Sequence, residues 1–287
     1  MIGASGQVGA ALTRELEARG HRVVGTHARV RQPGTLPLDV ADAAATARLI
    51  DESAAECVFC PAGLTHVDYC EDHPDDAFRV NRDAPAAAAR VAEKRGAAFV
   101  YYSTDYVFDG RGGPYTEDDP VRPLSVYGES KLAGERAVAA ENARTLVIRT
   151  TVVYGPEPQG KNFVYQLTRR LRAGERMRVP SDQISSPTYN ADIAHASVEL
   201  VTRGLTGVFN VAGSTVLDRH AFARLACEIF GLDAGLIDPI ATSELNQRAA
   251  RPLRGGLRLD RIRAATGLTP RSAREGLAAM REVMARV

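Results

Sequence analysis

Two patterns of hydrophobic and polar residues alternate along the first half of the chain. Short runs of β-branched and aromatic residues, typical of buried strands, are separated by alanine-rich stretches with the period of a helix. The runs predict strands at residues 21–26, 57–63 (including the loop that follows), 97–103 and 145–150. The stretches predict helices at residues 3–20 (including a glycine-rich turn), 41–56, 74–95 and 125–142. This alternation predicts an α/β fold with a doubly wound parallel sheet of the Rossmann type.

The pattern becomes less regular after residue 150. Helices are predicted at residues 160–174, 218–231 and 272–286, and one further strand at 207–213. Segments that contain proline and glycine separate these elements. We therefore expect a dinucleotide-binding domain over residues 1–150 and a smaller C-terminal substrate-binding lobe over residues 151–287. Residues from about 190 to 213 are expected to return to the first domain.

The first strand of the predicted sheet is almost absent. In a doubly wound domain the glycine-rich turn directly follows the central first strand, which is usually about five or six residues long. Here only Met1 and Ile2 precede Gly3. We expect this strand to be truncated and the native start to lie upstream of Met1.

Composition narrows the class of protein. A chain of 287 residues can bury a core without disulfides or structural metals. Its 36 basic and 35 acidic residues nearly balance, which argues against nucleic acid as a partner, because binding a phosphate backbone needs a concentrated basic face. The sequence shows neither a signal peptide nor an apolar run long enough to span a bilayer. We expect a cytoplasmic protein with no membrane partner, and we leave open whether it forms a homodimer.

Cysteine and histidine spacing indicates neither a disulfide framework nor a metal site. Cys57 and Cys60 lie in a predicted strand, where side chains alternate between faces, so their thiols should point apart. The six histidines show no HExxH or other paired ligand spacing. We therefore expect no metal.

Gly3, Gly6 and Gly9 form a GxxGxxG motif at the start of a predicted helix. Glycines in such a turn let backbone N–H groups and the positive helix end approach a pyrophosphate. The motif predicts a dinucleotide site, with simple helix capping as the alternative.

The end of the second strand bears on which dinucleotide binds. A carboxylate there accepts the ribose 2′-hydroxyl of NAD, whereas an arginine favours the 2′-phosphate of NADP. This chain has no acidic residue there and places His27, Arg29 and Arg31 after the strand. NADP is the expected cofactor and NAD the alternative. A solvated basic loop would also explain these residues.

Tyr127 and Lys131 form a YxxxK motif on a predicted helix, and Ser103 and Thr104 end the preceding strand. Residues four apart share a helix face, so the ammonium group could lie beside the phenol and lower its pKa, which would make Tyr127 a general acid. Thr104 would hydrogen-bond the same substrate oxygen, because parallel sheets bind ligands at this edge. The alternative is a surface tyrosine with a solvated lysine. Only three of the 36 basic residues are lysines, which makes a chance match less plausible.

Several motifs occur in order along the chain: GASGQVG, YSTDYVFDG, PYTEDDPVRPLSVYGESKLAGE, GKNFV, DQISSPTY and RPLRGGLRLD. Together they resemble the extended short-chain dehydrogenase/reductase superfamily, and within it the dTDP-4-dehydrorhamnose reductases. The resemblance implies an NADPH-dependent reductase of a nucleotide-linked 4-keto-6-deoxy sugar. Tyr127 would protonate the developing alkoxide, Thr104 would polarise the carbonyl, and Lys131 would bind the nicotinamide ribose.

We assign further residues to two sites on the same basis. The cofactor site would comprise Gly3, Ser5, Gly6, Gln7, Val8, His27, Arg29, Asp39, Val40, Pro61, Ala62, Gly63, Thr65, Asn81, Ser103, Tyr127 and Lys131. The substrate site would comprise Thr104, Asp105, Val152, Asn162, Gln183, Ser186 and Arg251. Asn162 and Gln183 are equally consistent with loop capping.

The chain also departs from the family pattern. Many of these reductases carry a tryptophan after the Arg-Thr of the fifth strand, whereas this chain reads RTTVVY at residues 149–154, and Ser185 stands where glycine is usual. RTTVVYG is similar to the β regulatory subunit of methionine adenosyltransferase, so a non-catalytic NADP-binding regulatory subunit is one alternative. A nucleotide-sugar epimerase is another.

Overall fold

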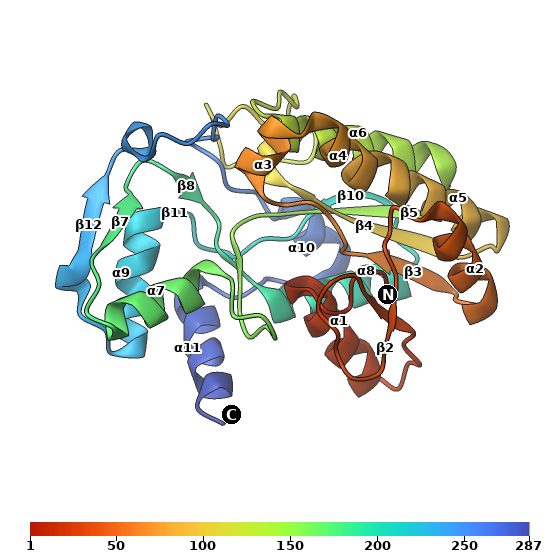
Figure 1. The fold of residues 1–287 in the computed structure, drawn as a ribbon, viewed down its shortest axis with the longest axis horizontal. Helices are drawn as coiled ribbons and strands as arrows, with labels where there is room; N and C mark the ends of the chain where they lie inside the picture. Colours follow the sequence, from red (N-terminus) through yellow and green to blue (C-terminus); the bar gives the residue numbers. More distant parts are fainter. Residues whose placement is uncertain (287) are drawn as a thin grey trace.

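Four parallel strands form the central sheet of the computed structural model, which describes residues 1–286 (Figure 1). In spatial order they are β10 (Gly207–Asn210), β5 (Thr145–Thr150), β4 (Ala98–Thr104) and β3 (Cys57–Cys60). A separate parallel pair, β1 (Gly25–His27) and β2 (Thr35–Pro37), lies beyond β3. The predicted α/β class with a Rossmann-like parallel sheet is thus confirmed.

Met1 and Ile2 connect the strand pair to the sheet. The Ile2 N–H donates to the Phe59 carbonyl at 2.9 Å, and the Thr26 N–H donates to the Met1 carbonyl at 3.0 Å. These two residues therefore take the position of a strand between β1 and β3. The predicted strand at 21–26 is wrong in its bounds, because residues 21–24 are not in a strand and the ladder begins at Gly25.

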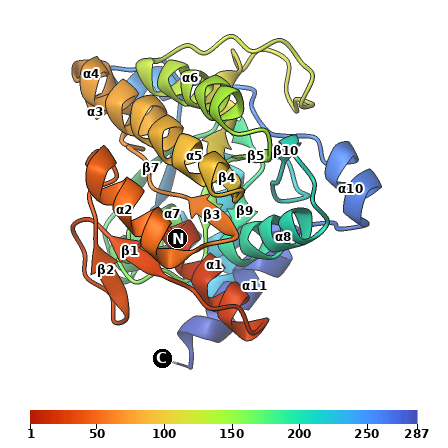
Figure 2. The same cartoon turned by 90° about the vertical axis from the view of Figure 1, so that its right-hand side faces the viewer.

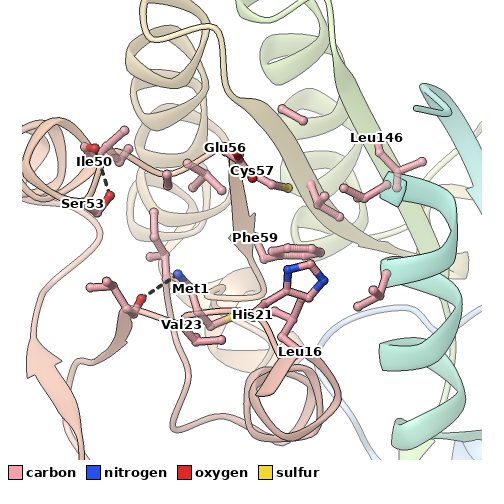
Figure 3. Close-up of a pocket in the computed structure, with 18 of the residues that line it drawn as sticks. Met1, Leu16, His21, Val23, Ile50, Ser53, Glu56, Cys57, Phe59 and Leu146 are labelled. Atoms are coloured by element: carbon pink, nitrogen blue, oxygen red, sulfur yellow. Dashed lines mark hydrogen bonds between the residues drawn. The ribbon is translucent and has the colours of Figure 1, made fainter. Parts of the chain in front are cut away.

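A cavity of about 490 Å³ lies next to Met1 (Figure 3). The residues that line it include apolar side chains from α1, β3, β5 and α8: Leu16, Cys57, Phe59, Leu146 and Val198. Cys57 and Leu146 lie at the amino ends of their strands. The cavity thus lies at the amino ends of the strands, whereas Thr104 lies at the carboxyl end of β4.

Helices cover both faces of the sheet (Figure 2). One face carries α2 (Ala43–Ser53), α5 (Ala84–Lys94) and α6 (Val126–Glu141), and the other carries α1 (Gln7–Ala18) and α8 (Asn190–Thr202). Each face of the sheet has its own hydrophobic core against the helices that cover it. Side chains of a strand point alternately to one core and to the other. In β4, Phe99 and Tyr101 pack under α5, whereas Val100 and Tyr102 pack under α1 and α8. Cys57 and Cys60 likewise belong to opposite cores and are free thiols, which confirms that they point apart.

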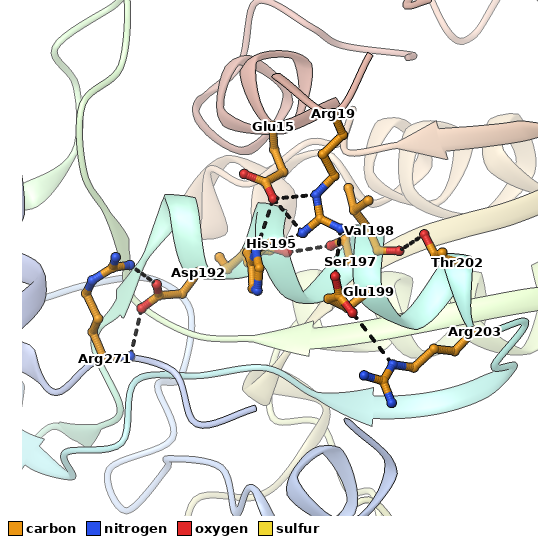
Figure 4. A network of polar contacts seen from close by, with 11 residues as sticks. Glu15, Arg19, Asp192, His195, Ser197, Val198, Glu199, Thr202, Arg203 and Arg271 are labelled. Carbon is orange, nitrogen blue, oxygen red and sulfur yellow. Dashed lines mark hydrogen bonds and ion pairs between the residues drawn. The ribbon is translucent and has the colours of Figure 1, made fainter. Parts of the chain in front are cut away.

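Charged side chains join α1 to α8 (Figure 4). The Arg19 guanidinium donates to Glu15 at 2.9 Å and to Glu199 at 2.6 Å, and Nδ1 of His195 lies 3.0 Å from the same Glu15 carboxylate. These groups are partly exposed, so each pair contributes little to stability. Their effect is to fix which faces of the two helices meet.

The helix predicted at 74–95 is not continuous. It consists of α4 (Pro74–Phe78), a π-helical turn (Arg79–Asp83) and α5, and a short helix α3 (Val67–Asp72) precedes it. In a regular α-helix the carbonyl of Asn81 would accept from residue 85, which is proline and has no N–H. The hydroxyl of Tyr101 donates to that carbonyl at 2.6 Å instead. Because the Asn81 carbonyl accepts from the Tyr101 hydroxyl and not from a backbone N–H, the regular α-helical winding is interrupted at Arg79–Asp83.

The second lobe packs three helices around a two-stranded sheet of β7 (Met177–Pro180) and β12 (Ile237–Ile240), and it has a hydrophobic core of its own. The helices are α7 (Phe163–Arg172), α9 (Arg219–Phe230) and α11 (Ala273–Met284). The remaining strands and α-helices are β6 (Val153–Tyr154), β8 (Ile184–Ser185), β9 (Thr188–Tyr189), β11 (Leu217–Asp218) and α10 (Asp260–Thr266). Within residues 1–286, no helix combines the length and the apolar character needed to cross a membrane.

Candidate active site

The predicted catalytic residues meet at the carboxyl end of the sheet. Thr104 is the last residue of β4, and Tyr127 lies in the first turn of α6, whose start is capped by the Ser125 hydroxyl accepting from the Gly128 N–H at 3.3 Å. Both side chains are buried, Thr104 is close enough to Tyr127 to lower its pKa, and the Thr104 hydroxyl donates to the Asp105 carboxylate at 3.4 Å. The ring of Tyr106 packs edge-on against Tyr127 with centroids 5.4 Å apart. This arrangement presents two hydroxyl groups to one point.

Tyr127 is held in its protonated form. Burial raises its pKa well above the ordinary value for tyrosine, and the nearby Thr104 offsets only part of that rise. Lys131 is not among the groups that shift this pKa here, so the expectation that it lowers the pKa of Tyr127 stays a prediction. A protonated phenol is nevertheless the form that can give a proton to an oxygen.

Lys131 lies on the same face of α6, four residues after Tyr127, and its side chain is buried. Its ammonium nitrogen sits 4.0 Å from the ring centre of Tyr101. Burial lowers the pKa of Lys131 to about 8, and nearby Cys60, Glu135 and Cys70 offset part of that effect. Lys131 therefore carries a buried charge near neutral pH without a direct carboxylate contact among the described residues.

The glycine turn has the shape that a pyrophosphate requires. Gly3 has φ +95°, and a Cβ at Gly9 would lie 2.1 Å from the Gly3 carbonyl oxygen, so the turn closes only without side chains there. Gly6 caps α1 and offers no side-chain acceptor to the first N–H groups of the helix. These N–H groups are available to an anion, so the residues present fit a dinucleotide.

Segments from elsewhere in the chain hold this turn in place. Gln7 donates to the Val153 carbonyl at 3.2 Å, and Gln159 donates to the Ser5 carbonyl at the same distance. Val8 is half-buried against the core under α1. The loop after β6 thus lies over the turn at its Ser5 side.

Four residues were assigned to the cofactor at the ends of β1 and β2, and the structure gives them different surroundings. His27 is buried, and its Nδ1 lies 2.7 Å from the Thr35 hydroxyl, which ties it to β2. The Asp39 carboxylate accepts from the Ala41 N–H at 2.9 Å, and Val40 packs in the core under α2 and α5. Arg29 is exposed. Of these four, Arg29 is the side chain best placed to meet a charged ligand from solvent.

The loop after β3 lies close to Lys131. A Cβ on Gly63 would lie 3.8 Å from the Lys131 ammonium nitrogen and 3.2 Å from Oδ1 of Asn81. That same Oδ1 accepts from the Leu64 N–H at 2.9 Å, and the Asn81 amide donates to the Leu64 carbonyl and to Ser130. Asn81 therefore attaches this loop to α6. Pro61 and Ala62 in the loop are half-buried, and Thr65 is exposed.

Comparisons with known proteins identify the family of this chain. The model of the family described as the RmlD substrate binding domain matches residues 1–286. The chain belongs to that family. A probable low-salt glycan biosynthesis reductase of Haloferax volcanii is 34% identical over 98% of this chain and 96% of that protein. The dTDP-4-dehydrorhamnose reductase of Mycobacterium tuberculosis is 37% identical over 94% of this chain and 87% of that protein.

Solved structures show the same fold. A dTDP-4-dehydrorhamnose reductase from Bacillus anthracis in complex with NADP superimposes with a TM-score of 0.90 at 28% identity, and the match covers 98% of this chain and 97% of that chain. The resemblance inferred from the motifs is therefore confirmed, and the shared fold extends over both lobes.

In this member of the RmlD family, the residues assigned to the substrate fall into two groups. Asp105 lies next to Thr104 and is buried, its carboxylate accepts from the Thr104 hydroxyl at 3.4 Å, and burial raises its pKa. Val152 has φ +40°, a strained conformation for a β-branched residue. Both lie directly after the carboxyl ends of β4 and β5.

The second group comes from the second lobe and its borders. Asn162 caps α7, and its side-chain amide donates to the Gly155 carbonyl at 2.9 Å. Its hydrogen bonds are therefore those of a capping residue, as the alternative to substrate binding predicted. Ser186 is fully buried, and its hydroxyl accepts from the Leu257 N–H. Gln183 is half-buried, and Arg251 pairs with Asp68 at 2.9 Å. Asn162, Ser186 and Arg251 therefore have partners within the protein, and Gln183 and Arg251 remain candidates for contact with the ligand.

Sequence patterns missed one residue of the RmlD-family site and assigned another that has a notable environment. Tyr106 packs edge-on against the ring of Tyr127, yet a tyrosine in a polar loop gives no periodic signal. Ser103 was assigned to the cofactor, and its buried hydroxyl has no hydrogen-bond partner among residues 1–286. A ligand or a water molecule that reaches it would satisfy that group.

Proposed function

We propose that this chain is an NADPH-dependent reductase of a nucleotide-linked 4-keto-6-deoxy sugar, such as dTDP-4-dehydrorhamnose. The observation that carries the proposal is the protonated Tyr127 hydroxyl against Thr104, with Lys131 on the same helix face. Relatives named dTDP-4-dehydrorhamnose reductase and a neighbouring structure in complex with NADP support the choice of substrate class and cofactor.

In the proposed reaction, each of these residues has a separate role. NADPH, when bound, supplies the hydride that reduces the keto carbon. The hydroxyls of Thr104 and Tyr127 hold the carbonyl oxygen, and Tyr127 donates its proton as negative charge develops there. Lys131 contributes a positive charge beneath the loop that carries Gly63. The backbone of the turn at Gly3–Gly6 and the start of α1 receive the pyrophosphate of the cofactor.

The direct test is the oxidation of NADPH by purified protein with dTDP-4-dehydrorhamnose, followed at the absorbance of the reduced nicotinamide. We expect stoichiometric loss of NADPH and formation of a 6-deoxyhexose, identified by NMR. A changed sugar with no net NADPH consumption would indicate an epimerase. Binding of NADPH with no reaction on any 4-keto-6-deoxy sugar would contradict the proposal and favour a regulatory protein.

Arg29 provides a test of the cofactor assignment. An Arg29→Glu variant should bind NADPH roughly tenfold more weakly, because an exposed charged hydrogen bond to the 2′-phosphate would be replaced by repulsion, while its affinity for NADH should hardly change. Fluorescence titration of both cofactors measures this ratio. Arg136→Glu, an exposed arginine of α6, is the matched control and should leave both affinities unchanged. If Arg29→Glu weakens the binding of NADPH and of NADH equally, Arg29 does not recognise the 2′-phosphate.

A further inference from the structure

Tyr101 of β4 contacts both α6 and the π-helical turn. Its side chain is fully buried, and its hydroxyl donates to the Asn81 carbonyl at 2.6 Å. This close approach depends on Gly134 of α6, because a Cβ there would lie 2.3 Å from the Tyr101 hydroxyl and 2.1 Å from the Asn81 carbonyl oxygen. The hydroxyl end of the Tyr101 ring is therefore fixed between the helix and the turn.

The face of the same ring meets the charge of Lys131. The ammonium nitrogen lies 4.0 Å from the ring centre of Tyr101, well inside the roughly 6 Å reach of a cation–π contact. Both side chains are buried, and such a contact is stronger where water is excluded. A Cβ on Gly63 would lie 3.8 Å from the same nitrogen, so the ring holds the ammonium close to the cofactor loop.

The ionisable neighbours of Lys131 within residues 1–286 provide no free anion for its charge. Glu135 acts on Lys131 from the next turn of α6, but both of its carboxylate oxygens accept from Arg149, at 2.9 and 2.6 Å. The thiols of Cys60 and Cys70 also act on Lys131, and burial raises the pKa of each to about 11, so both are neutral at neutral pH. The aromatic face is therefore the electron-rich group that this ammonium contacts directly.

We propose that Tyr101 is a positioning residue for catalysis: its ring face keeps Lys131 charged and close to the loop that carries Gly63, while its hydroxyl anchors the ring to the π-helical turn. The inference rests on the proposed function, in which the positive charge of Lys131 acts beneath the cofactor loop. An aromatic face attracts an ammonium group and not a neutral amine. A ring with less electron density should therefore let Lys131 lose its proton at lower pH.

Fluorinated rings test this contact while nearly preserving the shape of the side chain. Tyr101 is replaced with phenylalanine and then with mono-, di- and trifluorinated phenylalanine, which withdraw electrons from the ring in steps. Because the chain has only three lysines, NMR of isotope-labelled lysine can follow the titration of Lys131 directly. Tyr101→Phe keeps the ring and should preserve the pKa of about 8 for Lys131. Over the fluorinated series we expect this pKa to fall stepwise, by about one pH unit in total.

Phe99 provides the matched control. It is equally buried, lies two residues earlier on the same face of β4 and belongs to the same core as Tyr101. Its trifluorinated replacement should leave the titration of Lys131 unchanged. The signals of the other two lysines, Lys94 and Lys161, should be the same in every variant and serve as internal references.

The pH profile of kcat with NADPH and dTDP-4-dehydrorhamnose links the contact to the reaction. Its high-pH limb should move to lower pH along the fluorinated series, in step with the titration of Lys131. If that titration is the same throughout the series, the inference is wrong and the proposed function stands. A shifted titration with an unmoved limb would exclude a role for the contact in catalysis. If the titration shifts but the wild type reduces no 4-keto-6-deoxy sugar, the proposed function is wrong and the contact between Tyr101 and Lys131 stands.

Discussion

Replacing Tyr127 with phenylalanine should reduce kcat by roughly a hundred- to ten-thousandfold, the range expected when a general acid is removed. The buried hydroxyl is the only atom that changes, and burial has raised its pKa so that it carries a proton at neutral pH. The measurement is single-turnover reduction of dTDP-4-dehydrorhamnose by NADPH at saturating concentrations of both.

The control removes an equally buried hydroxyl elsewhere. Tyr102 lies in the same strand as Thr104, but its hydroxyl donates to Ser197 on the other face of the sheet at 2.9 Å. Tyr102→Phe should lose a little stability and keep its kcat. Activity of Tyr127→Phe within a few-fold of the wild type, with unchanged NADPH affinity, would exclude Tyr127 as the proton donor.

Replacing Lys131 with methionine should have two opposite effects. Activity should fall by roughly a hundredfold or more, because the positive charge under the cofactor loop is lost. The cofactor-free protein should nevertheless become more stable at neutral pH. A pKa of about 8, against an ordinary value of 10.5, means that the folded state disfavours the charged form, a cost on the order of 3 kcal/mol below pH 8.

The direction of the pH dependence follows from the same values. Between about pH 8 and pH 10.5 the unfolded chain holds a proton on Lys131 that the folded chain has released, so the free energy of unfolding of the wild type should rise with pH in that interval. Lys131→Met should not show this rise. Urea denaturation at several pH values measures both curves, with Lys94→Met, an exposed lysine at the end of α5, as the control. A Lys131→Met variant less stable than the wild type at neutral pH would show that the ammonium group is satisfied within the fold.

Much of the fold could be predicted because its signals are local. The strands of the central sheet are apolar runs, and the helices of the first domain have a regular period, so most bounds agree within a few residues. The π-helical turn could not be predicted from periodicity, because it depends on Pro85 and on a hydroxyl that arrives from β4. The two-residue strands of the second lobe form only through partners distant in the sequence.

In the candidate site, too, local features could be predicted and features that depend on tertiary contacts could not. The glycines and the YxxxK motif could be recognised because their spacing is dictated by a turn and by one helix face. The raised pKa of Tyr127 could not be predicted, because it depends on burial of the phenol in the folded protein, where Tyr106 packs against its ring.

The π-helical turn at Arg79–Asp83 makes the number of residues, and not only their identity, important for this site. Deleting one residue there would restore regular winding and rotate the preceding segment by about 100° relative to α5. Asn81 would then turn away from Leu64 and Ser130, and the loop that carries Gly63 would lose its attachment to α6. Natural variation in this segment should therefore favour substitutions and avoid insertions and deletions.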